Sequence, residues 1–78
     1  MERYKIVFES YNQPVLIGRF MLIFSRRRVN VTDFGFQKKS DEEGIFTIEF
    51  TSDEWQADNL LKQVQKQIDV FTASLHKI

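Results

Sequence analysis

Few residues in this sequence have side chains that could carry out catalysis. An active site needs a nucleophile beside a base, a pair of carboxylates in a pocket, or a metal ion. The single histidine, His76, lies near the C-terminal end close to Ser74 and Lys77, and the chain contains no cysteine. One histidine without cysteine cannot form a zinc site or an iron–sulfur cluster. The residue types therefore favour a binding protein over an enzyme and predict neither a metal nor another cofactor.

Three short motifs match known signatures without the context that each signature requires. Residues 33–35 (Asp-Phe-Gly) have the letters of the kinase magnesium motif, but 78 residues cannot hold a kinase. Residues 30–32 (Asn-Val-Thr) form a glycosylation sequon, which has meaning only in a secreted protein. Residues 44–50 (GIFTIEF) resemble the signature of RNA-recognition motifs, yet Ile45 and Thr47 stand where stacking aromatic residues belong. RNA binding therefore remains only a remote alternative.

The composition is that of a small globular protein without net charge. Lysine plus arginine and aspartate plus glutamate each number 11, so the chain lacks the excess of cations that strengthens binding to phosphates. The longest nearly apolar run, residues 20–24, is far too short to cross a bilayer. No apolar segment typical of a signal peptide precedes the first predicted strand. We therefore expect a cytoplasmic protein that binds neither nucleic acid nor membrane.

Hydrophobic periodicity predicts four strands and two helices, arranged in one domain over residues 1–78. Alternating apolar residues indicate strands at residues 4–11, 29–37, 45–50 and 70–75. Helical periodicity indicates helices from about residue 14 to 27 and from about residue 53 to 67, each preceded by residues that can cap a helix. Short connections in the order βαββαβ predict a ferredoxin-like α+β sandwich, in which two helices cover one face of a four-stranded antiparallel sheet.

The first predicted helix is apolar around most of its circumference. One stripe, spaced for the interior, contains Ile17, Phe20, Met21 and Phe24. Outside this stripe lie three further apolar residues, Leu16, Leu22 and Ile23. They fit either a well-buried helix or a second apolar face for a partner chain. The second predicted helix has a single stripe for the interior: Ala57, Leu60, Leu61, Val64 and Ile68.

Two segments of the chain, residues 12–31 and 60–70, together resemble an ACT domain. More specifically, they are similar to the small regulatory subunit of acetohydroxyacid synthase, also called acetolactate synthase. That family has a turn of the form N-x-P-G-x-L, a first helix ending F-S-x-R-x-x-N and a second helix ending K-Q-x-x-K-x-I-D-V. The matching residues here are Asn12, Pro14, Phe24, Ser25, Arg27, Asn30, Lys62, Gln63, Lys66, Ile68, Asp69 and Val70. The resemblance covers nearly the whole chain.

The resemblance implies a non-catalytic subunit that pairs with a thiamine-diphosphate-dependent catalytic subunit and raises its activity. Such subunits belong to branched-chain amino acid biosynthesis and often carry feedback inhibition by valine, which binds at the interface of a homodimer. The effector site implied by position contains Asn12, Pro14, Val15, Leu16 and Ile17 of one protomer, with Asn30 and Val31 of the other. Helix N-terminal N–H groups attract a carboxylate, and an asparagine amide can bind both charged groups of an amino acid.

One residue departs from the family pattern at the turn. The position after the proline is usually glycine and is Val15 here, and a β-branched residue resists close approach of the backbone to a ligand. We therefore expect a short activating subunit with weak valine inhibition rather than a valine sensor. Contacts to the catalytic subunit are expected from the arginines and the second apolar face of the first helix: Arg19, Leu22, Ile23, Arg26, Arg27 and Arg28.

Two other classes of function remain as alternatives. A stand-alone ACT-type sensor would bind an amino acid directly and control some other enzyme, which Val15 disfavours. A small enzyme ranks last, because fold alone never excludes chemistry. Asn12 and residues 26–28 also have purely structural interpretations, as a helix cap and as cations suited to the C-terminal end of a helix.

Overall fold

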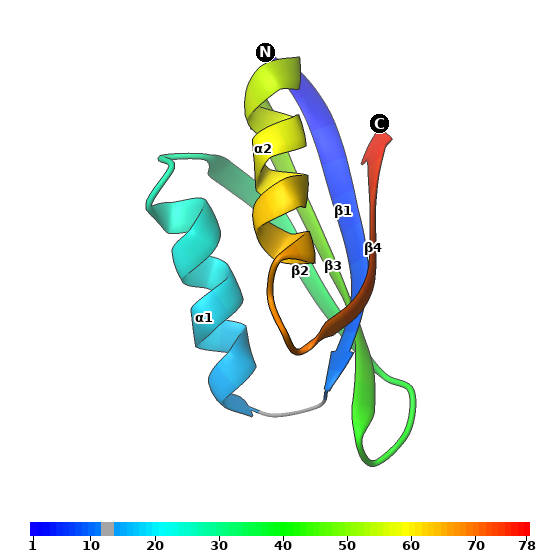
Figure 1. Ribbon diagram of the computed structural model, residues 1–78. Coiled ribbons are helices and arrows are strands. Elements are labelled where there is room, and N and C mark those ends of the chain that lie inside the picture. Colours follow the sequence, from blue (N-terminus) through cyan, green and yellow to red (C-terminus); the bar gives the residue numbers. More distant parts are fainter. Residues whose placement is uncertain (12–13) are drawn as a thin grey trace.

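The structure is a computed structural model that describes residues 1–11 and 14–78, without the side chains of residues 14 and 15. Six elements follow one another along the chain (Figure 1): β1 (Glu2–Tyr11), α1 (Pro14–Ser25), β2 (Asn30–Lys38), β3 (Glu43–Ser52), α2 (Glu54–Gln65) and β4 (Val70–Lys77). Their βαββαβ order confirms the predicted α+β architecture. Three strands are longer than predicted, because backbone pairing continues past the alternating apolar residues.

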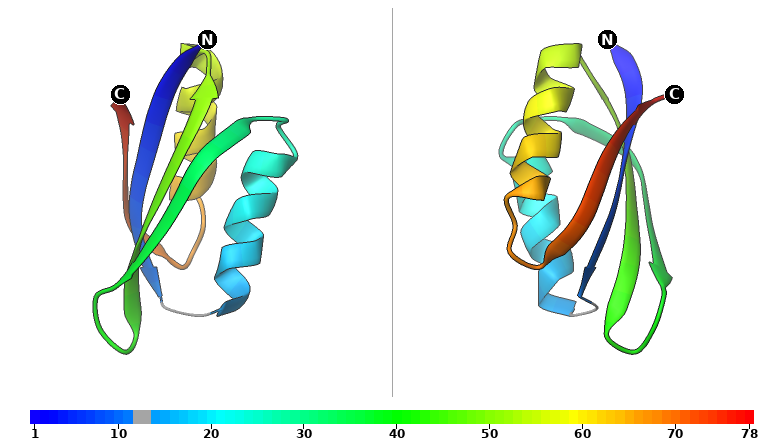
Figure 2. Two further views of the ribbon diagram at one scale, coloured as in Figure 1. Left: turned by 180° about the vertical axis from the view of Figure 1, so that it is seen from behind. Right: turned by 45° about the vertical axis from the view of Figure 1, so that its right-hand side comes forward.

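All four strands form one antiparallel sheet in the order β2-β3-β1-β4. The central strands, β1 and β3, align three pairs of buried hydrophobic residues: Tyr4–Phe50, Ile6–Ile48 and Phe8–Phe46. Successive side chains of a strand point to opposite faces, so these six residues share one face of the sheet. Both helices lie on that face and leave the other face open (Figure 2). The predicted ferredoxin-like arrangement is therefore confirmed.

Phenylalanine rings occupy the centre of the core between the sheet and the helices. Phe8 and Phe46 stack on the sheet with centroids 5.1 Å apart, and Phe20 of α1 lies edge-on to both, at 4.6 and 5.4 Å. One helical turn further along α1, Phe24 lies edge-on to Phe50 at 5.4 Å. Such ring pairs add about 0.5–1.5 kcal/mol each to the effect of burying their surface. Two phenylalanines therefore hold α1 on the sheet.

The buried face of α1 is rotated relative to the predicted stripe. The sequence predicts Ile17 inside and Leu16 outside, whereas the structure leaves Leu16 only 1% exposed and Ile17 38% exposed. The residues in the core are therefore Leu16, Phe20 and Phe24, spaced by four. The prediction was wrong at Leu16 and Ile17, and also at Met21, which is not part of the core, and at Ile23, which packs against it. The reason is that α1 is apolar on most sides. Its periodicity alone does not decide which side faces the sheet.

The buried face of α2 follows the prediction except at its last member. Three predicted residues are fully buried, with Leu61 packed beside them: Ala57, Leu60 and Val64. Ile68 is instead 91% exposed, because α2 ends at Gln65 and Ile68 falls in the turn before β4. With 12 residues each, α1 and α2 are too short to span a membrane.

Candidate functional site

The turn that the resemblance implicates in effector binding lies where α1 begins. Asn12 is outside the described residues, and Pro14 and Val15 are described only as the first backbone positions of α1. The side chain of Leu16 belongs to the core, so only its backbone could face a ligand. Ile17 presents a partly exposed apolar side chain at this end of the helix.

The second half of the expected effector site lies at the other end of α1, where the chain returns to the sheet (Figure 1). Asn30 is exposed at the start of β2 and pairs with Thr51 of β3, while Val31 packs against the core. Because α1 has 12 residues, it separates the two halves by about 18 Å. A single chain does not bring them together, so an effector site made of both needs a second protomer.

A groove between the two helices collects most of the residues expected to contact a partner. It has a volume of ≈ 350 Å³, and we call it the Arg groove; it is lined by Arg19, Leu22, Ile23, Arg26, Arg27, Gln63 and Gln67. The helices run in opposite directions across it (Figure 2). Five of these lining residues, from α1 and the two positions after it, are among those that the sequence leads us to expect at a partner contact, and the two glutamines are not. No sequence signal could have found them, because nothing sets them apart from the other polar residues in and after the second helix.

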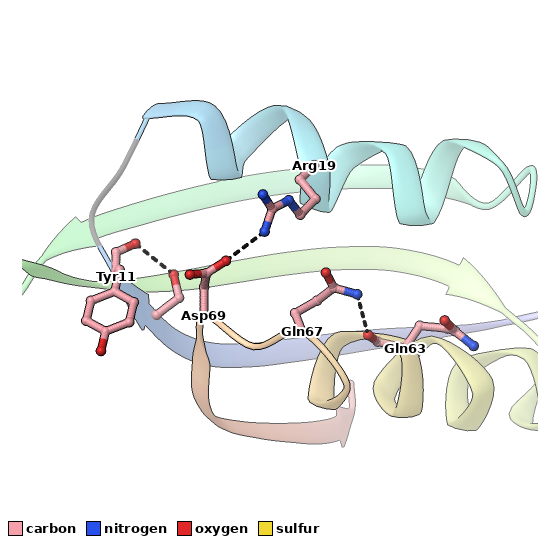
Figure 3. A network of polar contacts seen from close by, with 6 residues as sticks. Tyr11, Arg19, Gln63, Gln67 and Asp69 are labelled. Carbon is pink, nitrogen blue, oxygen red and sulfur yellow. Dashed lines mark hydrogen bonds and ion pairs between the residues drawn. The ribbon is translucent and has the colours of Figure 1, made fainter.

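One end of the Arg groove is closed by an ion pair. The Nη1 atom of Arg19 lies 2.6 Å from Oδ2 of Asp69, and these side chains are 46% and 21% exposed. The backbone of Asp69 is itself tied to the sheet, since its carbonyl accepts a 3.3 Å hydrogen bond from the N–H of Tyr11. Beside this pair, Nε2 of Gln67 donates to the carbonyl of Gln63 at 3.1 Å (Figure 3). The ion pair thus connects α1 to the turn between α2 and β4.

The other end of the Arg groove carries positive charge that is not neutralised. Arg26 makes no ion pair with any carboxylate in residues 1–11 and 14–78. Arg27 donates from Nη1 to the carbonyl of Ile23 at 3.1 Å, and its own carbonyl accepts from Nε2 of Gln56 at 3.0 Å. Leu22, which lies between Arg19 and Arg26 along the helix, is 51% exposed. Cations and an exposed apolar side chain therefore share one surface.

Arg28 does not line the Arg groove. Its φ of 56° lies in the left-handed region, and its N–H donates to the carbonyl of Ser25 at 3.1 Å. The next N–H, of Val29, donates to the carbonyl of Phe24 at 3.4 Å. Helices commonly end in this way, although glycine is the usual residue at the left-handed position. The structure thus assigns Arg28 a role in ending the helix and does not place it with the other arginines.

The open face of the sheet carries polar side chains joined across the strands. The carboxylate of Glu9 accepts from Nζ of Lys39 at 2.7 Å and from Oγ1 of Thr72 at 3.2 Å. The hydrogen bond from Lys39, followed by that from Thr72, lowers the pKa of Glu9 below its ordinary value. The same contact with Glu9 raises the pKa of Lys39. These groups stay charged at neutral pH and act as links between strands.

Catalytic and RNA-binding chemistry find little support on this face. Ser74 Oγ lies 2.9 Å from Nε2 of His76, but both side chains are exposed, and a nucleophile needs a base oriented by a third group. In the part of the chain that the structure describes, no three histidine or acidic side chains are grouped to hold a metal. Phe46 and Phe50 of the RNA-like segment point into the core, so they are not free to stack on bases.

The strand order, the connections and the placement of both helices define a ferredoxin-like fold. The ACT domain of GTP pyrophosphokinase from Chlorobium tepidum matches with a TM-score of 0.80 and 15% identity, over 95% of this chain and 96% of that one. The acetolactate synthase small subunit from Thermotoga maritima matches with a TM-score of 0.83 and 16% identity, over 96% of this chain and 47% of the subunit. The C-terminal domain of the MgtC protein from Mycobacterium tuberculosis matches with a TM-score of 0.80 and 8% identity, over 100% and 88%.

These likenesses concern the fold. This chain spans about half the length of the Thermotoga maritima subunit, and the three proteins carry the same fold under different names. One fold can hold unrelated functions, so identities of 8–16% establish the shared architecture alone. No protein-family model matches the sequence, and no curated protein is significantly similar to it.

Proposed function

We propose that this chain is a non-catalytic regulatory subunit of acetohydroxyacid synthase. In this proposal it acts in the cytoplasm, binds the catalytic subunit, raises its activity and serves the biosynthesis of branched-chain amino acids. The observation that supports it most is the match of 96% of the chain to an acetolactate synthase small subunit at a TM-score of 0.83. The family motif in residues 24–30 and 62–70 supports the same choice among proteins that share this fold.

The positions of the motif residues give further support. Arg27 and Gln63 both line the Arg groove, and Asp69 holds Arg19 at its end. Residues from two distant segments of the motif therefore meet at one surface. A surface assembled in this way suits recognition of a partner better than chemistry, because it contains cations, amides and apolar side chains without a nucleophile.

The proposed effector site is shared by two copies of this chain. β2 is an edge strand of the sheet, and an edge offers unpaired backbone N–H and C=O groups to a second copy. A twofold dimer through β2 would continue the sheet and bring Asn30 of one copy toward the α1 turn of the other. Valine or another branched-chain amino acid would then bind between them, weakly because of Val15.

The first expected result concerns activation. Addition of this chain to its cognate catalytic subunit should raise the rate of acetolactate formation and saturate as the complex fills, because a ligand that binds the active state better shifts the population toward it. Initial rates across a titration of the chain, together with co-sedimentation, measure this. The ACT domain of GTP pyrophosphokinase is the control, since it has the same fold. If the chain neither stimulates the catalytic subunit nor co-sediments with it, the proposed function is ruled out.

The second expected result concerns valine. In the stimulated complex, Val15→Gly should lower the valine concentration for half-inhibition by about tenfold, which corresponds to about 1.4 kcal/mol of binding free energy. Glycine allows the backbone to approach the carboxylate, whereas valine resists it. Val15→Ala is the matched control, because it removes the branched side chain without giving glycine's backbone freedom. Identical valine curves for the wild type and Val15→Gly would contradict this explanation of a weak effector site.

A second candidate function is an ACT-type amino-acid sensor that controls another enzyme. The observation in its favour is that the ACT domain of GTP pyrophosphokinase and this chain cover each other almost completely, at 95% and 96%. A sensor would bind an amino acid saturably in calorimetry without any catalytic subunit present. Saturable binding combined with no stimulation of acetohydroxyacid synthase would place this candidate first.

A further inference from the structure

We propose that the Arg groove docks an acidic segment of the partner protein, in which two carboxylates flank an apolar residue. This inference rests on the proposed function, since it names the surface that meets the catalytic subunit and the chemistry of the segment that binds there. It is carried by the spacing of the residues on α1 and by the charges around them.

Three residues of α1 form a single stripe with Arg26, whose N–H continues the helical pattern by donating to the carbonyl of Leu22 at 2.9 Å. Arg19, Leu22, Ile23 and Arg26 stand at positions i, i+3, i+4 and i+7, which lie on one side of a helix. Two helical turns separate the arginines by about 10 Å along the axis. The stripe therefore has an arginine at each end, of which Arg19 is paired with Asp69 but remains 46% exposed. Between the arginines, Leu22 is the exposed apolar side chain, while Ile23 packs against the core. A complementary segment carries a carboxylate at each end and an apolar side chain in the middle.

The charges favour an acidic occupant. Asp69 pairs with Arg19 at one end of the groove, and no described carboxylate pairs with Arg26 at the other. Most of the acidic residues that offset these cations in the overall charge stand elsewhere, notably in residues 41–43 and on β1. Asp53, before the start of α2, borders a separate hollow that also contains Arg27. A neutral chain therefore carries a locally positive groove, and potentials of opposite sign guide partners together and fix their register.

The apolar centre of the groove argues for a peptide segment over a single small anion. A phosphate or carboxylate ion binds where several donors converge on one point. Here Leu22 and Ile23 lie between Arg19 and Arg26, and Leu22 remains half exposed. An exposed apolar side chain between cations gains by contact with another apolar side chain. A segment long enough to reach both arginines meets both requirements.

The test compares charge reversal inside and outside the groove, with the full chain and its catalytic subunit. Arg26→Glu should weaken the affinity about tenfold or more, and Leu22→Ser should also weaken it, because each removes one part of the stripe. Lys62→Glu is the matched control, because it makes the same charge change at an exposed residue that does not line the groove. Lys62 lies one turn along α2 from Asp58, on the side of the helix near β4. This variant should bind like the wild type. The replaced side chains are exposed, so circular dichroism should show all three variants folded. Binding of the wild type should weaken with salt more steeply than binding of Arg26→Glu.

A second probe separates this inference from the proposed function. A helical peptide with glutamates seven residues apart and leucine between them should shift the amide resonances of residues 19–27 and 63–67, whereas the same peptide with lysines should not. If the catalytic subunit does not bind but the acidic peptide does, the proposed function fails and the groove proposal stands. Equal affinity of Arg26→Glu and wild type for the catalytic subunit would overturn the groove proposal and leave the proposed function intact. If inorganic phosphate shifts these resonances and the acidic peptide does not, the groove proposal is overturned in favour of a small anion. If Arg26→Glu loses self-association but keeps its affinity for the catalytic subunit, the groove proposal is overturned in favour of a second copy of this chain.

Discussion

Replacement of Phe20 with alanine is expected to lower the free energy of unfolding by about 3–5 kcal/mol. Phe20 is fully buried and contacts both Phe8 and Phe46 edge-on, so its removal leaves a cavity that the sheet cannot close. A folded chain of 78 residues has a total stability of roughly 4–12 kcal/mol. The variant should therefore lose a large share of its stability, and urea unfolding followed by circular dichroism measures the change.

Phe71→Ala is the control for this experiment. Phe71 is 44% exposed and makes one edge-on contact with Tyr11, at a centroid distance of 4.7 Å. Loss of this contact should cost about 1 kcal/mol or less. Equal losses in Phe20→Ala and Phe71→Ala would show that α1 is not anchored through Phe20.

The second large effect is expected at Leu16. Leu16→Ala should cost about 2–5 kcal/mol, since the side chain is buried in the core, whereas Ile17→Ala should cost about 1 kcal/mol or less. The two residues are neighbours of similar size, so each serves as the control for the other. Urea unfolding of both variants measures the difference.

This comparison also bears on the proposed effector site. A changed valine response in Leu16→Ala would report on the stability of α1, because the Leu16 side chain does not face solvent. A changed response in Ile17→Ala, with stability preserved, would report on ligand contact at the exposed side chain. A larger stability loss in Ile17→Ala than in Leu16→Ala would contradict the observed rotation of α1.

The sequence predicts the strands well because their alternation leaves one choice. Tyr4, Ile6 and Phe8 alternate with polar or smaller residues, and a shift by one residue would exchange the buried and exposed faces of the whole strand. The same reasoning identifies the buried face of β3. α2 is equally clear at Ala57, Leu60 and Val64, because its other faces are polar.

The candidate site is only partly predictable. Arg19, Leu22, Ile23, Arg26 and Arg27 follow from the arginines and second apolar face of one helix. Gln63 of α2 and Gln67 just after it join them only because α2 lies beside α1. The sequence does not distinguish these two glutamines from other polar residues at the surface. The pair between Arg19 and Asp69 joins residues 50 positions apart for the same reason.

By itself, then, the sequence determined the order of the elements, the faces of β1, β3 and α2, and the lack of cysteine chemistry. Each follows from a local pattern that has one solution. Only the tertiary structure decided the rotation of α1, the end of α2 before Ile68, and the meeting of two helices at the Arg groove. A helix that is apolar on most sides could bury any of several sides. Which side of α1 faces the sheet is decided by close packing against three rings of the sheet: Phe8, Phe46 and Phe50.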